Sequence, residues 1–112
     1  MRSLSIQVQP DLIPEPDIEK IRRLFEDLKC NSLVEKTEFD EGNDKGHYLN
    51  FTYGTHDPQS LWADIQKKIY QHTTFGTKLL ECSIAMCSGE EGWNNYMLLY
   101  HFDPTVPTKT FE

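Results

Sequence analysis

The sequence predicts an α+β domain in which two helices pack on one face of a mostly antiparallel sheet. Five segments have the residue patterns of strands, and two segments repeat apolar residues at helical spacing. Their order along the chain is β-α-β-β-α-β-β, which indicates a two-layer sandwich. The first six elements follow the ferredoxin-like split β-α-β order, with one strand added at the end. A length of 112 residues fits one domain, expected over residues 1–103 with an extended tail over 104–112.

The first strand and the first helix follow from two clear periodicities. Apolar residues alternate with polar ones over residues 3–9, which is typical of a half-buried strand. A proline-rich loop follows, and Glu15 or Asp17 then opens a helix with Pro16 near its first helical position. The apolar stripe of this helix comprises Ile18, Ile21, Leu24, Phe25 and Leu28.

The next two strands are expected to form a hairpin. Residues 34–40 alternate imperfectly, which favours a strand near a sheet edge. Residues 41–46 are rich in residues that tolerate a positive φ, so they predict a turn. The third strand follows, with Leu49, Phe51 and Tyr53 on one face.

The second helix begins with a strong start signal. Asp57 is expected to cap it and Pro58 to occupy its first position, before a linker over residues 72–77. Its buried stripe is expected to comprise Leu61, Trp62, Ile65, Ile69 and Tyr70.

The last two strands are predicted on either side of a glycine-rich turn at residues 88–92. One face of the fourth strand is expected to carry Leu80, Cys82, Ile84 and Met86. The fifth strand, residues 96–102, is apolar on both faces apart from His101, so we expect it to be central in the sheet.

Charge and cysteine content restrict the functional classes. The formal net charge is −7, from 18 acidic and 11 basic residues, which opposes binding to nucleic acid or to an anionic membrane. It favours a basic protein partner through long-range steering, although negative charge also serves solubility alone. Three cysteines, an odd number, occur without a signal-peptide pattern, so we expect reduced thiols in the cytoplasm. No apolar run approaches the roughly 20 residues of a membrane span.

The acidic stretch EKTEFDEGND, residues 35–44, is the strongest candidate for a binding surface. It contains a single lysine and five carboxylates: Glu35, Glu38, Asp40, Glu41 and Asp44. Carboxylates form strong and selective pairs with Lys and Arg on a partner. The alternative is an edge strand whose charges only prevent aggregation. Calcium binding is not expected, because the spacing of the acidic residues does not fit an EF-hand.

A second candidate is the turn GEEGWNNY, residues 89–96. Glu90 and Glu91 would add charge, while Trp93 and Tyr96 would anchor a partner, as aromatic residues do in interface hot spots. The alternative for Trp93 is that it packs back over the sheet. The strand aromatics Phe39, Phe51, Tyr53 and Tyr100 are expected in the core, because RNA stacking rings need basic neighbours.

No pattern of catalytic, cofactor-binding or metal-ligating residues is evident. The four histidines lack the i, i+4 spacing of a helical zinc site. An enzyme would depend on His56, His101 and a nearby carboxylate, and nothing in the sequence holds these at a fixed spacing. We therefore expect a protein that is not an enzyme and needs no cofactor.

The acidic hairpin EKTEFDEGND, the turn GEEGWNNY and the strand MLLYHFD together resemble the small immunity proteins of bacterial polymorphic toxin systems, including contact-dependent growth inhibition. The resemblance lies in size, acidity and the absence of catalytic motifs. It implies a cytoplasmic protein that neutralises a cognate basic toxin, often a nuclease, by forming a tight complex. The alternative function is a structural or regulatory ferredoxin-like module that self-associates through an edge strand, as a homodimer.

Overall fold

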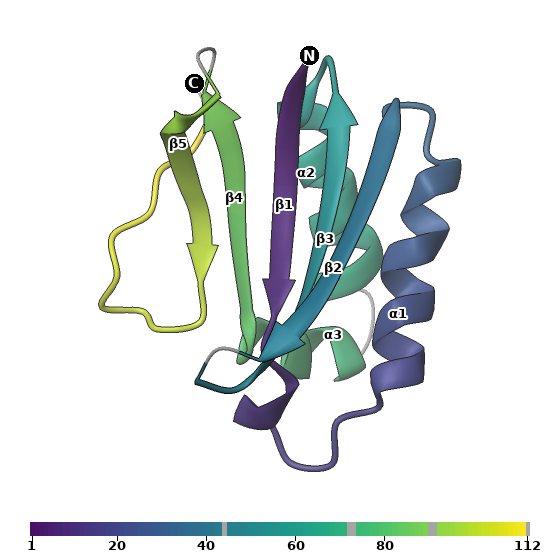
Figure 1. Ribbon diagram of the computed structural model, residues 1–112, viewed down its shortest axis with the longest axis vertical. Coiled ribbons are helices and arrows are strands. Elements are labelled where there is room, and N and C mark those ends of the chain that lie inside the picture. Colours follow the sequence, from purple (N-terminus) through teal and green to yellow (C-terminus); the bar gives the residue numbers. More distant parts are fainter. Residues whose placement is uncertain (44, 72–73, 90–91, 112) are drawn as a thin grey trace.

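The structure, a computed structural model, describes residues 1–43, 45–71, 74–89 and 92–111. Within these ranges, five strands form one antiparallel sheet in the order β2-β3-β1-β4-β5, and the helices lie on one side of it (Figure 1). The strands are β1 Arg2–Val8, β2 Lys36–Asn43, β3 His47–Thr55, β4 Ser83–Gly89 and β5 Gly92–His101. The predicted α+β class and antiparallel sheet are therefore confirmed.

Three α-helices occur in the described part of the chain, one more than the sequence predicts. They are α1 Ile18–Glu26, α2 Pro58–Ile65 and α3 Thr74–Leu80. Shorter helical turns extend or precede them: the 3-10 turns η1 Pro10–Leu12 and η2 Asp27–Cys30, and the π-helical segment η3 Gln66–Tyr70.

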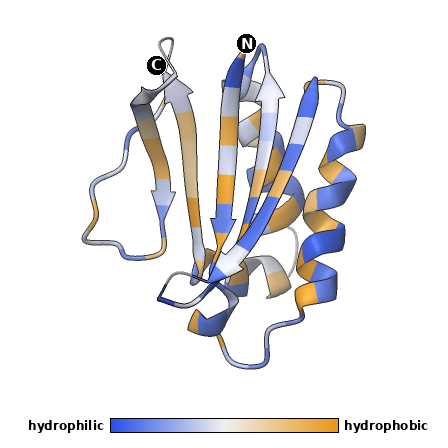
Figure 2. Cartoon of the chain, viewed as in Figure 1, coloured by the Kyte–Doolittle hydropathy of each residue, from blue (hydrophilic) through white to orange (hydrophobic). Residues whose placement is uncertain are grey.

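Strand β1 lies at the centre of the sheet because its alternation gives it one fully apolar face. Leu4, Ile6 and Val8 are completely buried toward the helices, and the strand pairs with β3 on one side and β4 on the other. Figure 2 shows this alternation of hydrophobic and hydrophilic residues along β1. The predicted buried face of β3, with Leu49, Phe51 and Tyr53, is also confirmed.

Both predicted helix caps are present. Asp17 Oδ1 accepts a hydrogen bond from Lys20 N, and Asp57 Oδ1 accepts one from Ser60 N, both at 3.1 Å. Each bond satisfies a backbone donor that the first turn of a helix leaves free. Pro58 begins α2 as predicted, whereas Pro16 precedes the cap and lies outside α1.

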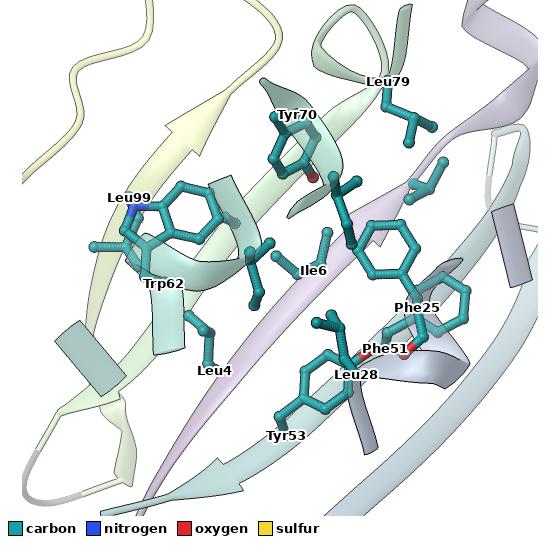
Figure 3. Packing of buried hydrophobic residues seen from close by; sticks show 14 of the residues in the cluster. Leu4, Ile6, Phe25, Leu28, Phe51, Tyr53, Trp62, Tyr70, Leu79 and Leu99 are labelled. Carbon is teal, nitrogen blue, oxygen red and sulfur yellow. Dashed lines mark hydrogen bonds between the residues drawn. The ribbon is translucent and has the colours of Figure 1, made fainter. Parts of the chain in front are cut away.

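Aromatic side chains from the sheet and the helices pack among aliphatic ones in the core (Figure 3). Phe25 of α1 stacks on Phe51 of β3 with ring centroids 4.6 Å apart. The ring of Trp62 packs edge-on against that of Tyr70, with centroids 6.1 Å apart, beside Leu99 of β5. Such ring pairs add about 0.5–1.5 kcal/mol beyond the area that they bury.

Helix α3 replaces most of the linker predicted over residues 72–77, of which residues 72 and 73 lie outside the described residues. Gly76 lies within the predicted linker, but in the structure it permits close packing. A Cβ atom there would lie 1.9 Å from the carbonyl oxygen of Ile69 in η3. Only glycine therefore allows α3 to approach η3 this closely.

The buried face of β4 is the opposite of the predicted one. Ser83, Ala85 and Cys87 are buried toward the helices, whereas Ile84 and Met86 are half-buried on the other side. Leu80 belongs to α3, and Cys82 precedes the strand. Small side chains under the helices allow a close approach, so the larger residues of the strand face away.

Strand β5 is an edge strand, so the prediction of a central position is wrong. Ala85 pairs with Tyr100 but Met86 pairs with Leu98, so Leu99 is an extra, bulged residue. The bulge turns both Leu99 and Tyr100 toward the helices, where the Tyr100 hydroxyl donates to the Leu80 carbonyl at 2.5 Å. The continuous apolar run in this strand thus reflects a shift in its pairing register with β4, not burial on both faces.

The described part of the tail, residues 104–111, returns along the outer side of β5 (Figure 1). It turns at Asp103, whose Oδ1 accepts a hydrogen bond from Thr105 N at 2.9 Å. Further along, Lys109 N donates to the carbonyl of Leu98 at 2.7 Å. The tail therefore occupies part of the backbone edge that β5 would otherwise expose. Across the described ranges, no helix combines the length and the apolar composition needed to cross a membrane.

Candidate functional site

The acidic candidates Glu38 and Asp40 lie on β2, at one edge of the sheet, as the imperfect alternation predicts. Glu38 is opposite Thr52 and Asp40 is opposite Asn50, so both carboxylates are on the side of the sheet that faces away from the helices. Both are exposed, and so is Glu35, which immediately precedes the strand. Glu38 and Asp40 therefore form an acidic surface on one side of β2, and Glu35 adds an exposed carboxylate at the start of the strand.

Ion pairs with neighbouring side chains neutralise this acidic surface only in part. Lys36 Nζ lies 3.1 Å from Glu38 Oε1, and both side chains are 63% exposed. Such exposed pairs contribute little and exchange readily for other partners. Within the described ranges, Glu35 and Asp40 make no ion pair.

Glu41 has a different environment from the other carboxylates of β2. It is opposite Leu49, on the helix side, where one oxygen pairs with Arg22 Nη2 and the other lies 2.6 Å from His47 Nε2. The hydrogen bond with His47, and then the charge of Arg22, hold the pKa of Glu41 below its usual value. Glu41 is thus already paired inside the molecule and is less available to a partner than Glu38 or Asp40.

An open groove lies between α1 and β2, beside this acidic surface. Its volume is about 390 Å³, within the range of ligand-binding clefts. Its lining includes Arg22, Phe25, Lys29, Phe39, Phe51 and Tyr53. The groove therefore has an aromatic floor with charged residues at its rim.

Phe39 is the main departure from expectation, because the sequence predicts it in the core. It is 51% exposed at the mouth of the groove. Its ring lies 5.1 Å from that of Phe51, and the Arg22 guanidinium lies 5.6 Å from its centroid. A phenylalanine in an otherwise charged edge strand is the sequence signal that would have identified this groove.

The groove has fixed walls because α1 is tied to β3 behind it. The hydroxyl of Tyr53 donates to the backbone carbonyl of Phe25 at 2.5 Å, at the last turn of α1. The Tyr53 side chain is buried, and burial raises the pKa of its phenol well above its usual value. The groove is therefore a preformed feature of the fold.

The aromatic candidates Trp93 and Tyr96 lie on β5, at the opposite edge of the sheet. They are 46% and 53% exposed, so Trp93 does not pack fully over the sheet. Strands β3, β1 and β4 separate them from β2, which places the two edges about 19 Å apart at 4.7–4.9 Å per strand. Asp44, Glu90 and Glu91 lie outside the described residues.

The histidines named for an enzymatic site do not converge. His56 follows Thr55, which pairs with Arg2, whereas His101 pairs with Ile84, which lies opposite Gln7. Arg2 and Gln7 are about 17 Å apart along β1 at roughly 3.4 Å per residue. The His101 ring is held locally, because its Nδ1 accepts a hydrogen bond from Asp103 N at 3.0 Å.

The metal-ligating side chains and the thiols of the described part of the chain are dispersed. Its His, Cys, Asp and Glu residues form no group of three or more that could hold a metal ion. The three cysteines are free thiols, with Cys30 exposed and the other two buried. Burial raises the pKa of Cys82 to about 11, which disfavours its reactive thiolate form.

Comparisons with protein-family models, with curated proteins and with solved structures found no match to this chain.

Proposed function

We propose that this protein is a binding protein that captures a basic protein partner through the acidic surface Glu35, Glu38 and Asp40 on β2. The observation that carries the proposal is that Glu38 and Asp40 share one side of an edge strand, exposed and largely unpaired within the described residues, with Glu35 exposed just before the strand. Charge-assisted bonds to Lys or Arg would fix the partner, and the net charge of −7 would accelerate association.

The particular partner that we propose is a cognate toxin domain with a basic substrate groove, such as a nuclease. An acidic strand edge resembles a phosphate backbone in charge, so it would occupy such a groove and exclude the substrate. This assignment rests on the resemblance to immunity proteins described above. We also propose that the fold is a ferredoxin-like variant, since β2-β3-β1-β4 has the strand order of a split β-α-β sheet and β5 extends it.

The test is capture of partners from the native host by the tagged protein, followed by mass spectrometry. A single basic protein should be retained at low salt and released at moderate salt, because exposed charge pairs are screened. The double variant Glu38→Lys, Asp40→Lys should slow association with that protein at least tenfold.

The matched control carries the same change in net charge elsewhere. Glu15 and Glu81 are exposed and lie outside β2, so the double variant Glu15→Lys, Glu81→Lys should slow association by much less. Equal effects of the two double variants would show that only net charge matters, and would remove β2 from the proposed function.

A further inference from the structure

We infer that β2 receives an extended segment of the partner as an added strand, with an apolar side chain of that segment seated in the groove between α1 and β2. This inference rests on the proposed function and specifies its geometry. Strand β2 is eight residues long, and among the described residues it has a strand partner, β3, on one side only. An exposed edge of this length is a ready template for another strand.

The two faces of β2 specify the chemistry of the added strand. Glu38 and Asp40 are on the side away from the helices, whereas Thr37 and Phe39 are on the groove side, opposite Tyr53 and Phe51. Side chains of an added strand would alternate in the same way. The segment that fits therefore alternates Lys or Arg with aliphatic or aromatic residues.

The groove adds an anchoring point to the backbone pairing. It is open beside Phe39, and its volume of about 390 Å³ accommodates a large apolar side chain. Phe39 exposes half of its surface there, so covering it would remove apolar area from water. Its contacts with Phe51 and Arg22 hold the ring in place before a partner arrives, which limits the entropy lost on binding.

A second copy of this chain is a poor occupant of the same edge. Each copy of β2 would bring Glu38, Asp40 and Glu41 against a single cation, Lys36. Like charges on neighbouring strands are destabilising, whereas a basic strand turns the same charges into attractions. The opposite edge, β5, is already contacted by the tail through Lys109 and Leu98.

The test uses designed peptides as the probe, measured against the whole protein by fluorescence anisotropy. The first is a nine-residue peptide that alternates Lys and Val and carries one Phe at its centre. Two further peptides have the same sequence but are N-methylated at either the odd or the even backbone nitrogens. An added strand bonds its neighbour through alternate residues, so one methylated peptide should bind at least tenfold more weakly and the other within about threefold of the parent.

Protein variants locate the binding site. Phe39→Ala should weaken the parent peptide at least tenfold, whereas Tyr96→Ala on β5 should change its affinity less than twofold. The two side chains are matched controls, since they are 51% and 53% exposed. Circular dichroism of both variants verifies that each is folded.

Two outcomes would overturn the inference. Equal binding of all three peptides would show that charge alone attracts them, and would leave the acidic-surface proposal intact. Absence of binding by the parent peptide at millimolar concentration would also refute strand addition. The proposed function fails separately, when the Glu38→Lys, Asp40→Lys variant captures the natural partner as well as the native protein does.

Discussion

Replacing Tyr53 by Phe should destabilise the protein by about 0.5–1.5 kcal/mol. The substitution keeps the ring in the core but removes the hydroxyl that donates to the Phe25 carbonyl at 2.5 Å. Tyr53 is only 2% exposed, so water cannot readily replace the lost donor. The expected cost is the net contribution of one buried hydrogen bond, because the Phe25 carbonyl still accepts from Asp27 N. Over 112 residues, each kcal/mol corresponds to about 4 °C in Tm.

Urea unfolding followed by circular dichroism measures this cost. The midpoint should fall while the slope with denaturant stays constant, because the exposed area on unfolding hardly changes. Tyr96→Phe is the matched control, since Tyr96 is 53% exposed and its substitution should change the free energy of unfolding by less than about 0.5 kcal/mol. A midpoint for Tyr53→Phe equal to that of Tyr96→Phe would refute the reasoning.

The same substitution has a consequence at high pH. Burial raises the pKa of Tyr53 above the value near 10 of an unfolded tyrosine, so the folded state favours the neutral phenol. The stabilisation is fully present below pH 10 and is lost as the pH rises through the folded pKa. Tyr53→Phe should therefore lose stability less steeply above pH 10 than the native protein. The slope should not vanish, because burial also raises the pKa of Tyr70.

Three further predictions concern the acid limb, the thiols and the α3 packing. Hydrogen bonds to Ser60 lower the pKa of Asp57, so its contribution to stability is present above its ordinary pKa near 4 and is lost as the pH falls. Asp57→Asn keeps a capping oxygen and should therefore make Tm fall less steeply with decreasing pH. An unchanged dependence of Tm on acid pH would contradict this. Ellman's reagent should modify Cys30 quickly and the buried Cys82 and Cys87 only in denaturant; three fast thiols in the native protein would contradict their burial. Gly76→Ala should lower stability by about 1–3 kcal/mol in urea unfolding, because its Cβ would lie 1.9 Å from the Ile69 carbonyl oxygen, and a native-like midpoint would show that α3 can shift.

The sequence predicts the elements whose signals are local. The alternation in β1 and the caps Asp17 and Asp57 are confirmed, because periodicity and capping depend on residues a few positions apart. The errors arise where distant packing decides. The predicted linker over residues 72–77 includes α3, where Gly76 packs against η3. Leu99 breaks the two-residue period of β5 because the pairing with β4 is bulged.

The same division applies to the candidate site. Charge alone identifies Glu38 and Asp40, and the edge position predicted for their strand is confirmed. Charge cannot show that Glu41 points to the other side and pairs with Arg22 and His47, because these contacts come from α1 and β3. It also cannot show that β2 and Trp93 lie at opposite edges, since that depends on the strand order.

The contact between Lys109 and Leu98 has a consequence for assembly. A sheet with two free edges can extend from copy to copy in a head-to-tail manner, which produces filaments when the rotation does not close. Here the tail contacts the outer edge of β5, while the negative charges of β2 would repel the β2 strand of another copy. Removing residues 107–112 would free one end of such a chain, and the truncated protein is therefore the form in which ordered polymers should be sought.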